Sequence, residues 1–229
     1  MTEAEWLACN DPQTMLGVFI NEKRSSNRKF HLFACACVRR IWRLLTDERI
    51  QLVVEMSEQS ADGLISPDTI DETWCNWVHE DSSFFEGEDA EVAALAATGV
   101  SARWNLEDAQ EYAVCAVTGF QQGMIDPTHP GAIVELKAQE QLLRCVVGNP
   151  FRPSHLDASS LTPTVKALAE TAYAERHLPS GHLDETVLAI LADALEDAGC
   201  SNGELLRHLR SPGPHVRGCW AIDLALGKE

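Results

Sequence analysis

The sequence predicts an all-α fold, an irregular multi-helix bundle or short helical solenoid of about nine to eleven helices. Apolar residues recur at three- and four-residue spacing along most of the 229-residue chain, which is the period of a helix with one buried face. No strand-like alternation extends beyond a few residues, and no sequence repeat of fixed period is present. With 45% hydrophobic residues, the chain can bury a substantial core.

Helix starts and stops in the first part of the chain are marked by capping residues, prolines and glycines. Asp11 and Pro12 form a start signal, and Gly63 and Gly123 are stop signals. The most regular pattern covers residues 27–45, where an apolar stripe lies opposite several arginines. The expected helices cover residues 11–20, 27–45, 47–63, 66–78, 90–98, 106–122 and 131–147.

An irregular connection at residues 148–163, GNPFRPSHLDASSLTP, divides the chain, because its three prolines prevent a continuous helix. We expect an N-terminal helical region, residues 1–148, and a C-terminal helical region, residues 149–229, that pack together as one unit. After the connection, Thr162 and Pro163 restart the helical pattern. The expected helices of the C-terminal region cover residues 162–173, 184–198, 203–209 and 216–226, and Gly227 ends the last of them.

Charge and cysteine use restrict the class of protein. The formal net charge of −17 argues against direct binding to nucleic acid, which requires a basic face. Apolar runs are shorter than the roughly 18 residues that cross a bilayer. The start MTEAEWLACNDP carries neither a basic leader nor a hydrophobic signal region. We therefore expect a cytoplasmic protein that does not bind membranes and whose cysteines are mainly free thiols in the core.

Charged residues are unevenly distributed along the chain. Basic residues concentrate in residues 23–49, and acidic residues concentrate in residues 80–111, directly after Trp74 and Trp77. Solvated surfaces and attraction within the molecule are the simplest explanation. The alternatives are that the aromatic and acidic segment binds a partner protein, or that it mimics nucleic acid.

Four residues near the C-terminus form the most concrete candidate site. Cys200, His208, His215 and Cys219 carry thiol and imidazole groups, which are suitable zinc ligands. His215 and Cys219 would share a helix face if the last helix began by residue 215. The spacing of the four contains no CxxC pair and matches no standard zinc motif. Zinc is therefore the alternative expectation, and buried side chains without a cofactor are the favoured one.

The turn SPGPHVRGCW, residues 211–220, offers a second candidate site, for an anion. Backbone N–H groups at the start of the last helix lie beside His215 and Arg217 in the sequence, and together they could hold a carboxylate or phosphate. The same stretch also serves as a helix junction, which is the interpretation we favour. Arg152, in NPFRP, could tie its loop to an acid of LADALEDAG, residues 191–199.

The sequence identifies no catalytic residue. It contains no GxSxG elbow, phosphate loop or dinucleotide glycine pattern, and the polar face of an amphipathic helix explains the carboxylates of residues 191–199. We therefore expect a non-enzymatic protein-interaction or regulatory module that binds another protein and needs no cofactor. A zinc-binding protein or metal-dependent hydrolase is the alternative, and an acidic nucleic-acid mimic is the second alternative.

Several stretches resemble a large group of paralogous proteins from planctomycete bacteria, notably Gemmata and its relatives. These stretches are MTEAEWLACNDPQTML, RKFHLFACACVRRIWRLLTDER, LLRCVVGNPFRP, LTPTVKALAETAYAER, ILADALEDAGC and GPHVRGCWAIDLALGKE. The resemblance covers both ends and fades over residues 66–131, where that group has alanine-rich helices. It implies a helical domain from a bacterial cytoplasm, with no established activity to assign to particular residues.

Overall fold

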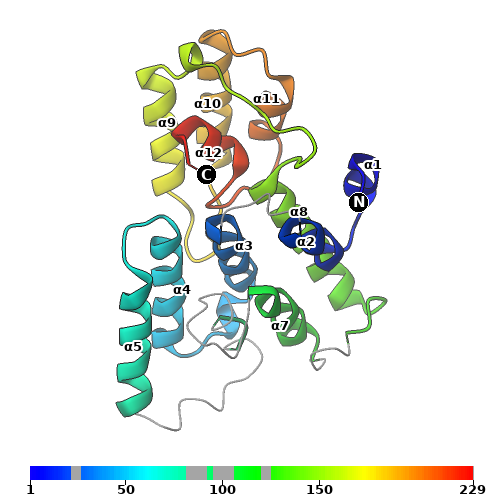
Figure 1. Ribbon diagram of the computed structural model, residues 1–229, viewed down its shortest axis with the longest axis vertical. Helices are drawn as coiled ribbons and strands as arrows, with labels where there is room; N and C mark the ends of the chain where they lie inside the picture. The colour runs from blue at the N-terminus through cyan, green and yellow to red at the C-terminus, as the bar shows by residue number, and fades with distance from the viewer. Residues whose placement is uncertain (22–26, 81–91, 95–105, 120–124, 229) are drawn as a thin grey trace. The chain divides into compact units, whose positions relative to one another are not determined.

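The protein has an all-α fold, seen in a computed structural model that describes residues 1–21, 27–80, 92–94, 106–119 and 125–228 (Figure 1). Within these residues β-type backbone pairing is limited to two isolated bridges, His177 with His182 and His182 with Val216. None of the described helices combines the length and the apolar character needed to cross a membrane. The expected helix at 90–98 lies largely outside the described residues.

The chain divides into two compact units. The central unit is Cys9–Glu140, and the C-terminal unit combines Met1–Ala8 with Gln141–Glu229. The division lies inside helix α8, Pro130–Val147, so the connection at 148–163 belongs within the C-terminal unit. The first helix, α1, Glu3–Ala8, belongs to the C-terminal unit although it begins the chain.

In the central unit, α3, Asn27–Arg40, contacts both α4, Glu48–Ala61, and α7, Leu106–Thr118. Its buried residues run continuously from Leu32 to Arg39, so the helix is covered on most sides rather than along one stripe. The remaining elements of this unit are α2, Pro12–Asn21, the 3-10 turn η1, Trp42–Leu44, α5, Pro67–Glu80, and the first part of α8.

Two arginines on α3 enter buried or partly buried ion pairs in the central unit. Arg39 makes two hydrogen bonds to Glu58, with Nη2 2.7 Å from Oε2, and both side chains are at most 3% exposed. The next residue, Arg40, binds Glu135 through Nε and Nη2, each 3.0 Å from a carboxylate oxygen. The arginines that the sequence places opposite the apolar stripe are therefore not all solvated, because carboxylates on other helices pair with them.

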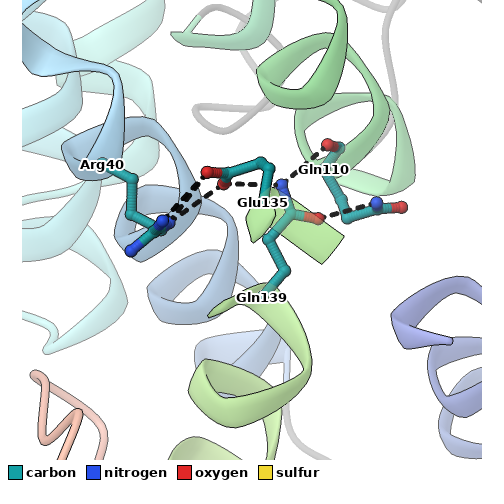
Figure 2. Close-up of polar contacts among 4 residues, drawn as sticks. All are labelled: Arg40, Gln110, Glu135 and Gln139. Carbon is teal, nitrogen blue, oxygen red and sulfur yellow. Dashed lines mark hydrogen bonds and ion pairs between the residues drawn. The ribbon is translucent and has the colours of Figure 1, made fainter. Parts of the chain in front are cut away.

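The Arg40–Glu135 pair continues into a chain of polar contacts inside the central unit (Figure 2). Gln139 donates to Glu135 Oε1 at 3.1 Å and to the backbone oxygen of Gln110 at 3.2 Å. Gln110 in turn donates to Gln139 Oε1 at 2.7 Å. We call these four residues the amide–carboxylate network. It links α3, α7 and α8 through hydrogen bonds in which each of the four side chains has a partner.

The C-terminal unit is built from short capped helices. They are α9, Pro163–Ala174, α10, Glu185–Asp197, α11, Gly203–Leu209, and α12, Trp220–Leu226, with the 3-10 turn η3, Ala158–Ser160, before α9. α10 contacts α9 and α11, and α12 contacts α9 and α11. Thr162 caps α9 as predicted, accepting from Val165 N, and Gly227 ends α12 at φ 65°.

The expected helix over 216–226 begins later than predicted, at Trp220. Residues 210–219 instead form a long loop between α11 and α12, and Cys219 is the N-cap of α12. The expectation that His215 and Cys219 share a helix face is therefore wrong. Both nevertheless lie in the same loop, and both are buried.

Candidate metal centre

Four side chains of the C-terminal unit bring together ligand atoms that all lie within 4.8 Å of one another. They are Cys145, His208, His215 and Cys219, which we call the Cys/His group. Cys145 lies in the last turn of α8, His208 in the last turn of α11, and the other two residues in the loop before α12. Three separate segments therefore converge on one point.

Local backbone geometry directs the loop inward. Gly213 has φ 83°, a conformation in which a side chain would be strained, and a Cβ there would lie 3.1 Å from the His215 backbone nitrogen. A hydrogen bond from another part of the unit also fixes the loop, because Leu183 N donates to the backbone oxygen of His215 at 2.9 Å. The result is that His215, although it follows two prolines in a turn sequence, is only 2% exposed.

The four side chains are buried or half-buried, and their ligand atoms are closely spaced. Cys145 is 2% exposed, Cys219 is fully buried, and His208 is half-buried. His208 Nε2 lies 3.2 Å from Cys219 Sγ, and the two histidine rings meet edge to face with their centres 4.7 Å apart. The two sulfur atoms lie within 4.8 Å of each other.

One ring nitrogen of His215 has no hydrogen-bond partner among the described residues. His215 Nε2 lies 3.0 Å from the backbone oxygen of Ser211. Because a carbonyl oxygen can only accept, Nε2 carries a proton, and in the neutral imidazole Nδ1 bears a lone pair. That Nδ1 is buried and has no hydrogen-bond partner among the residues that the structure describes. A buried acceptor without a donor costs about 1–3 kcal/mol, so its presence calls for an explanation.

Electrostatics within the group favour the thiolate form of Cys219. Burial alone would raise the pKa of the Cys219 thiol, but the neighbouring Cys145, His208 and His215 side chains outweigh burial and hold this pKa well below its ordinary value. For His215, burial alone would lower the pKa, whereas interaction with the Cys219 sulfur raises it above its usual value. A sulfur that ionises readily beside two imidazoles is a ready metal ligand.

The dimensions match a tetrahedral zinc site. Zinc binds cysteine sulfur at about 2.3 Å and histidine nitrogen at about 2.0–2.1 Å, which separates the ligand atoms of a tetrahedron by about 3.3–3.8 Å. The upper limit of 4.8 Å in the group exceeds this by about an ångström, so small side-chain movements would close the shell around one ion. Two thiolates and two neutral imidazoles would also cancel the double positive charge of zinc, which keeps the buried centre neutral.

The surrounding residues support the ligands. His215 already donates its other ring nitrogen to a backbone oxygen, which is the usual outer contact of a metal-binding histidine. Trp220 lies against the His208 ring, with 5.1 Å between centres. On its other side, Trp220 approaches Gly148, where a Cβ would lie only 3.0 Å from the indole Cγ and where φ is 71°. Gly148 thus lets the indole ring sit closely beside the end of α8.

The structure brings together three of the four metal ligands expected from the sequence. Cys200 lies outside the group; it is buried just after Gly199, at the end of α10. Cys145 takes the fourth place. Sequence reasoning treats Cys145 as one more apolar residue of an amphipathic helix, among Leu142, Leu143 and Val146, and nothing in its local pattern separates a ligand from a core thiol.

The two side chains expected to form the anion site do not lie together at the surface. His215 is buried and its Nε2 is engaged by Ser211, so it does not offer a surface donor beside Arg217. Arg217 is half-buried, with its guanidinium carbon 5.1 Å from the centre of the Tyr173 ring. The interpretation of SPGPHVRGCW as a helix junction fits the observed loop, which also carries two of the four ligands.

The prediction that Arg152 pairs with an acid of residues 191–199 is wrong. Arg152 Nε lies 2.7 Å from Glu3 Oε1, so the loop after α8 is tied to α1 rather than to α10. The acids of α10 face another arginine instead, because Arg210 Nη2 lies 2.7 Å from Asp193 Oδ1 and 2.5 Å from Glu196 Oε2. The contact is structural, as expected, but it fastens the beginning of the chain to the C-terminal unit.

The tryptophans expected to face a partner belong to α5. Trp74 is 6% exposed and forms part of the core, and Trp77 is half-buried. The acidic residues 81–91, which follow them, lie outside the described residues. Trp74 is therefore not available as a surface contact, while the expectation for the acidic segment stays a prediction.

Comparison with known proteins gave no relatives: no family model matches the chain, and neither the curated proteins nor the solved structures include a significant match.

Proposed function

We propose that the C-terminal unit binds one zinc ion through Cys145, His208, His215 and Cys219, and that this ion is structural. The observation that carries the proposal is His215 Nδ1, a buried lone pair without a donor beside two buried thiols. A zinc ion would occupy the position toward which these three atoms and His208 converge. It would turn the unsatisfied nitrogen into a ligand.

The ligand types favour zinc over the hard cations. Calcium and magnesium require oxygen ligands, whereas two sulfurs and two nitrogens in a tetrahedral arrangement are typical of zinc. All four ligand positions come from the protein, so no position is left for an activated water or a substrate. This favours a structural ion over a metal-dependent hydrolase.

The ion would hold together segments that are far apart in the chain. Cys145 ends α8, whereas His208 ends α11, and the other two ligands lie just beyond. Because the unfolded chain does not present these ligands together, binding energy becomes folding energy. The C-terminal unit, with its short helices, would gain stability that its core alone does not supply.

The direct test is metal titration of the purified full-length protein after treatment with a chelator. We expect one zinc ion per chain, and a cobalt(II) complex whose visible spectrum is that of tetrahedral thiolate coordination. His215→Ala is expected to abolish stoichiometric binding, while His155→Ala, which removes an exposed histidine outside the group, leaves it unchanged. Equal binding by wild type and His215→Ala would refute the proposal.

The cellular compartment of the protein is part of the same proposal. All eight cysteines of the chain are free thiols, which supports a reducing compartment and hence the cytoplasmic location expected from the sequence. A partner protein and a nucleic-acid mimic both stay predictions, because the acidic segment on which they depend lies largely outside the described residues.

A further inference from the structure

We propose that Cys145 and Cys219 are a redox couple that peroxide converts into a disulfide, releasing the zinc ion. This inference depends on the zinc site proposed above, and it adds a second activity to that site, the sensing of an oxidant. The argument starts from the positions of the cysteines.

Cys145 and Cys219 are in direct contact. Their sulfur atoms lie within 4.8 Å of each other, among ligand atoms that are all this close, and both side chains are buried. Cys35 and Cys37 are a contrasting pair, because residues two positions apart on one helix point in different directions. Among the described cysteines, Cys75 is exposed and belongs to neither pair.

The contact joins a cysteine on a helix to a cysteine at the end of a loop. Cys145 is held within α8, whereas Cys219 lies at the end of the 210–219 loop. As N-cap of α12, Cys219 makes no side-chain capping bond that a movement of its sulfur would break. A disulfide needs a sulfur–sulfur distance of about 2.05 Å, so the two sulfurs must move toward each other for the bond to form.

The chemistry balances with one molecule of hydrogen peroxide. The Cys219 thiolate attacks one peroxide oxygen, the O–O bond breaks, and hydroxide leaves, so that Cys219 becomes a sulfenic acid. The Cys145 thiolate then attacks the Cys219 sulfur, the S–S bond forms and a second hydroxide leaves. The two sulfurs lose two electrons, the peroxide gains them, and two protons from solvent convert the hydroxides to water.

Disulfide formation removes half of the ligands. The two histidines that remain, His208 and His215, do not complete a tetrahedral zinc site, so zinc leaves as the sulfurs join. A dithiol reductant reverses the oxidation by exchange and is itself oxidised to a disulfide. The unit would then lose the stabilisation supplied by zinc and gain a covalent link between α8 and the start of α12.

The experiment uses full-length Cys75→Ser protein loaded with zinc, because Cys75 is exposed and would react independently. Hydrogen peroxide is added in the presence of a zinc-sensitive dye, and disulfides are located by peptide mapping without reduction. We expect one zinc released per chain, a loss of two free thiols, and a crosslink between the peptides containing Cys145 and Cys219. Dithiothreitol with added zinc is expected to restore binding.

One control variant and two possible outcomes separate the two proposals. Cys200→Ser, which alters a buried cysteine outside the group, is expected to release zinc as the parent protein does. Zinc-loaded protein that keeps both its metal and its thiols under peroxide would overturn the redox couple while leaving the zinc site intact. Metal-free protein that forms the Cys145–Cys219 crosslink, in a chain that never binds zinc, would support the couple and refute the zinc site.

Discussion

The two units bury polar side chains in different ways. In the central unit, the amide–carboxylate network of Arg40, Gln110, Glu135 and Gln139 gives each side chain a hydrogen-bond partner (Figure 2). In the C-terminal unit, the Cys/His group leaves His215 Nδ1 without one among the described residues. A satisfied network needs nothing further to be stable, whereas an unsatisfied group of metal-ligating side chains indicates a missing ligand.

The largest expected effect is that metal removal destabilises the C-terminal unit and leaves the central unit unchanged. With free zinc at 1,000 times the dissociation constant, zinc binding would stabilise the C-terminal unit by about 4 kcal/mol. Adding a strong chelator should therefore raise amide hydrogen exchange in α9–α12 strongly and leave α3 and α4 unchanged. Equal exchange with and without chelator in α9–α12 would contradict the assignment, and His215→Ala serves as the zinc-insensitive control.

The reverse experiment breaks the satisfied network. Glu135→Ala removes the carboxylate that accepts from Arg40 and Gln139, so Arg40 loses its ion-pair partner and Gln139 loses one of its two acceptors. We expect a loss of about 2 kcal/mol in the free energy of unfolding, less than for a fully buried ion pair because the Arg40 side chain is 28% exposed.

Zinc content distinguishes Glu135→Ala from the variants of the zinc site. Zinc stoichiometry should be unchanged in Glu135→Ala, measured by elemental analysis beside urea unfolding. A variant as stable as wild type would show that the network contributes less than its geometry implies.

A smaller effect is expected from the support of the metal site. In Gly148→Ala the new methyl group would lie 3.0 Å from Trp220 Cγ, at a position with φ 71°. The left-handed conformation costs a non-glycine residue about 1–2 kcal/mol, and displacement of the indole would disturb His208. We expect zinc affinity to fall about tenfold, as seen for outer contacts of metal ligands. Gly199→Ala, with open space around its Cβ, is the matched control for conformational strain alone.

The smallest effect concerns a contact of the C-terminal unit that needs no metal. Asp184 caps α10, accepting from Thr186 and Val187, and the hydrogen bond to Val187 is the main reason that its pKa lies below the usual value. Because the folded-state pKa is depressed, the stabilising contribution is present above the unfolded-state pKa and is lost as pH falls through the folded-state value.

Asp184→Asn, which keeps the capping oxygen, should therefore match wild type at neutral pH and show a flatter loss of stability in acid. Chelator-treated protein gives the cleanest measurement, by thermal unfolding between neutral pH and about pH 2. An unchanged acid profile would show that the cap does not titrate as described.

Local signals in the sequence were sufficient for much of the fold. Thr162 before Pro163 marks the start of α9, and Gly227 marks the end of α12, because caps depend on neighbouring residues only. The start of α12 was predicted too early, since the residues from 216 to 219 carry an apolar pattern that continues into the helix. There the inward course of the loop, held by the Leu183–His215 contact, decides the structure.

The candidate site was predicted only in part, because the sequence shows neighbours along the chain but not tertiary contacts. His208, His215 and Cys219 lie close together in the sequence, so their types alone suggested a group. Cys145 joins them only through tertiary packing, and its position on α8 looks like that of any core residue. The pairing of Arg40 with Glu135 was invisible for the same reason, because both partners look like ordinary polar-face residues of separate helices.

The most direct measurement compares two cysteine variants by zinc stoichiometry under native mass spectrometry. Cys145→Ser removes a sulfur from the Cys/His group, whereas Cys200→Ser removes a buried sulfur outside it. We predict that wild type and Cys200→Ser each carry one zinc ion per chain and that Cys145→Ser carries none. Zinc retained by Cys145→Ser and lost by Cys200→Ser, or absent from the wild-type protein, would contradict the account.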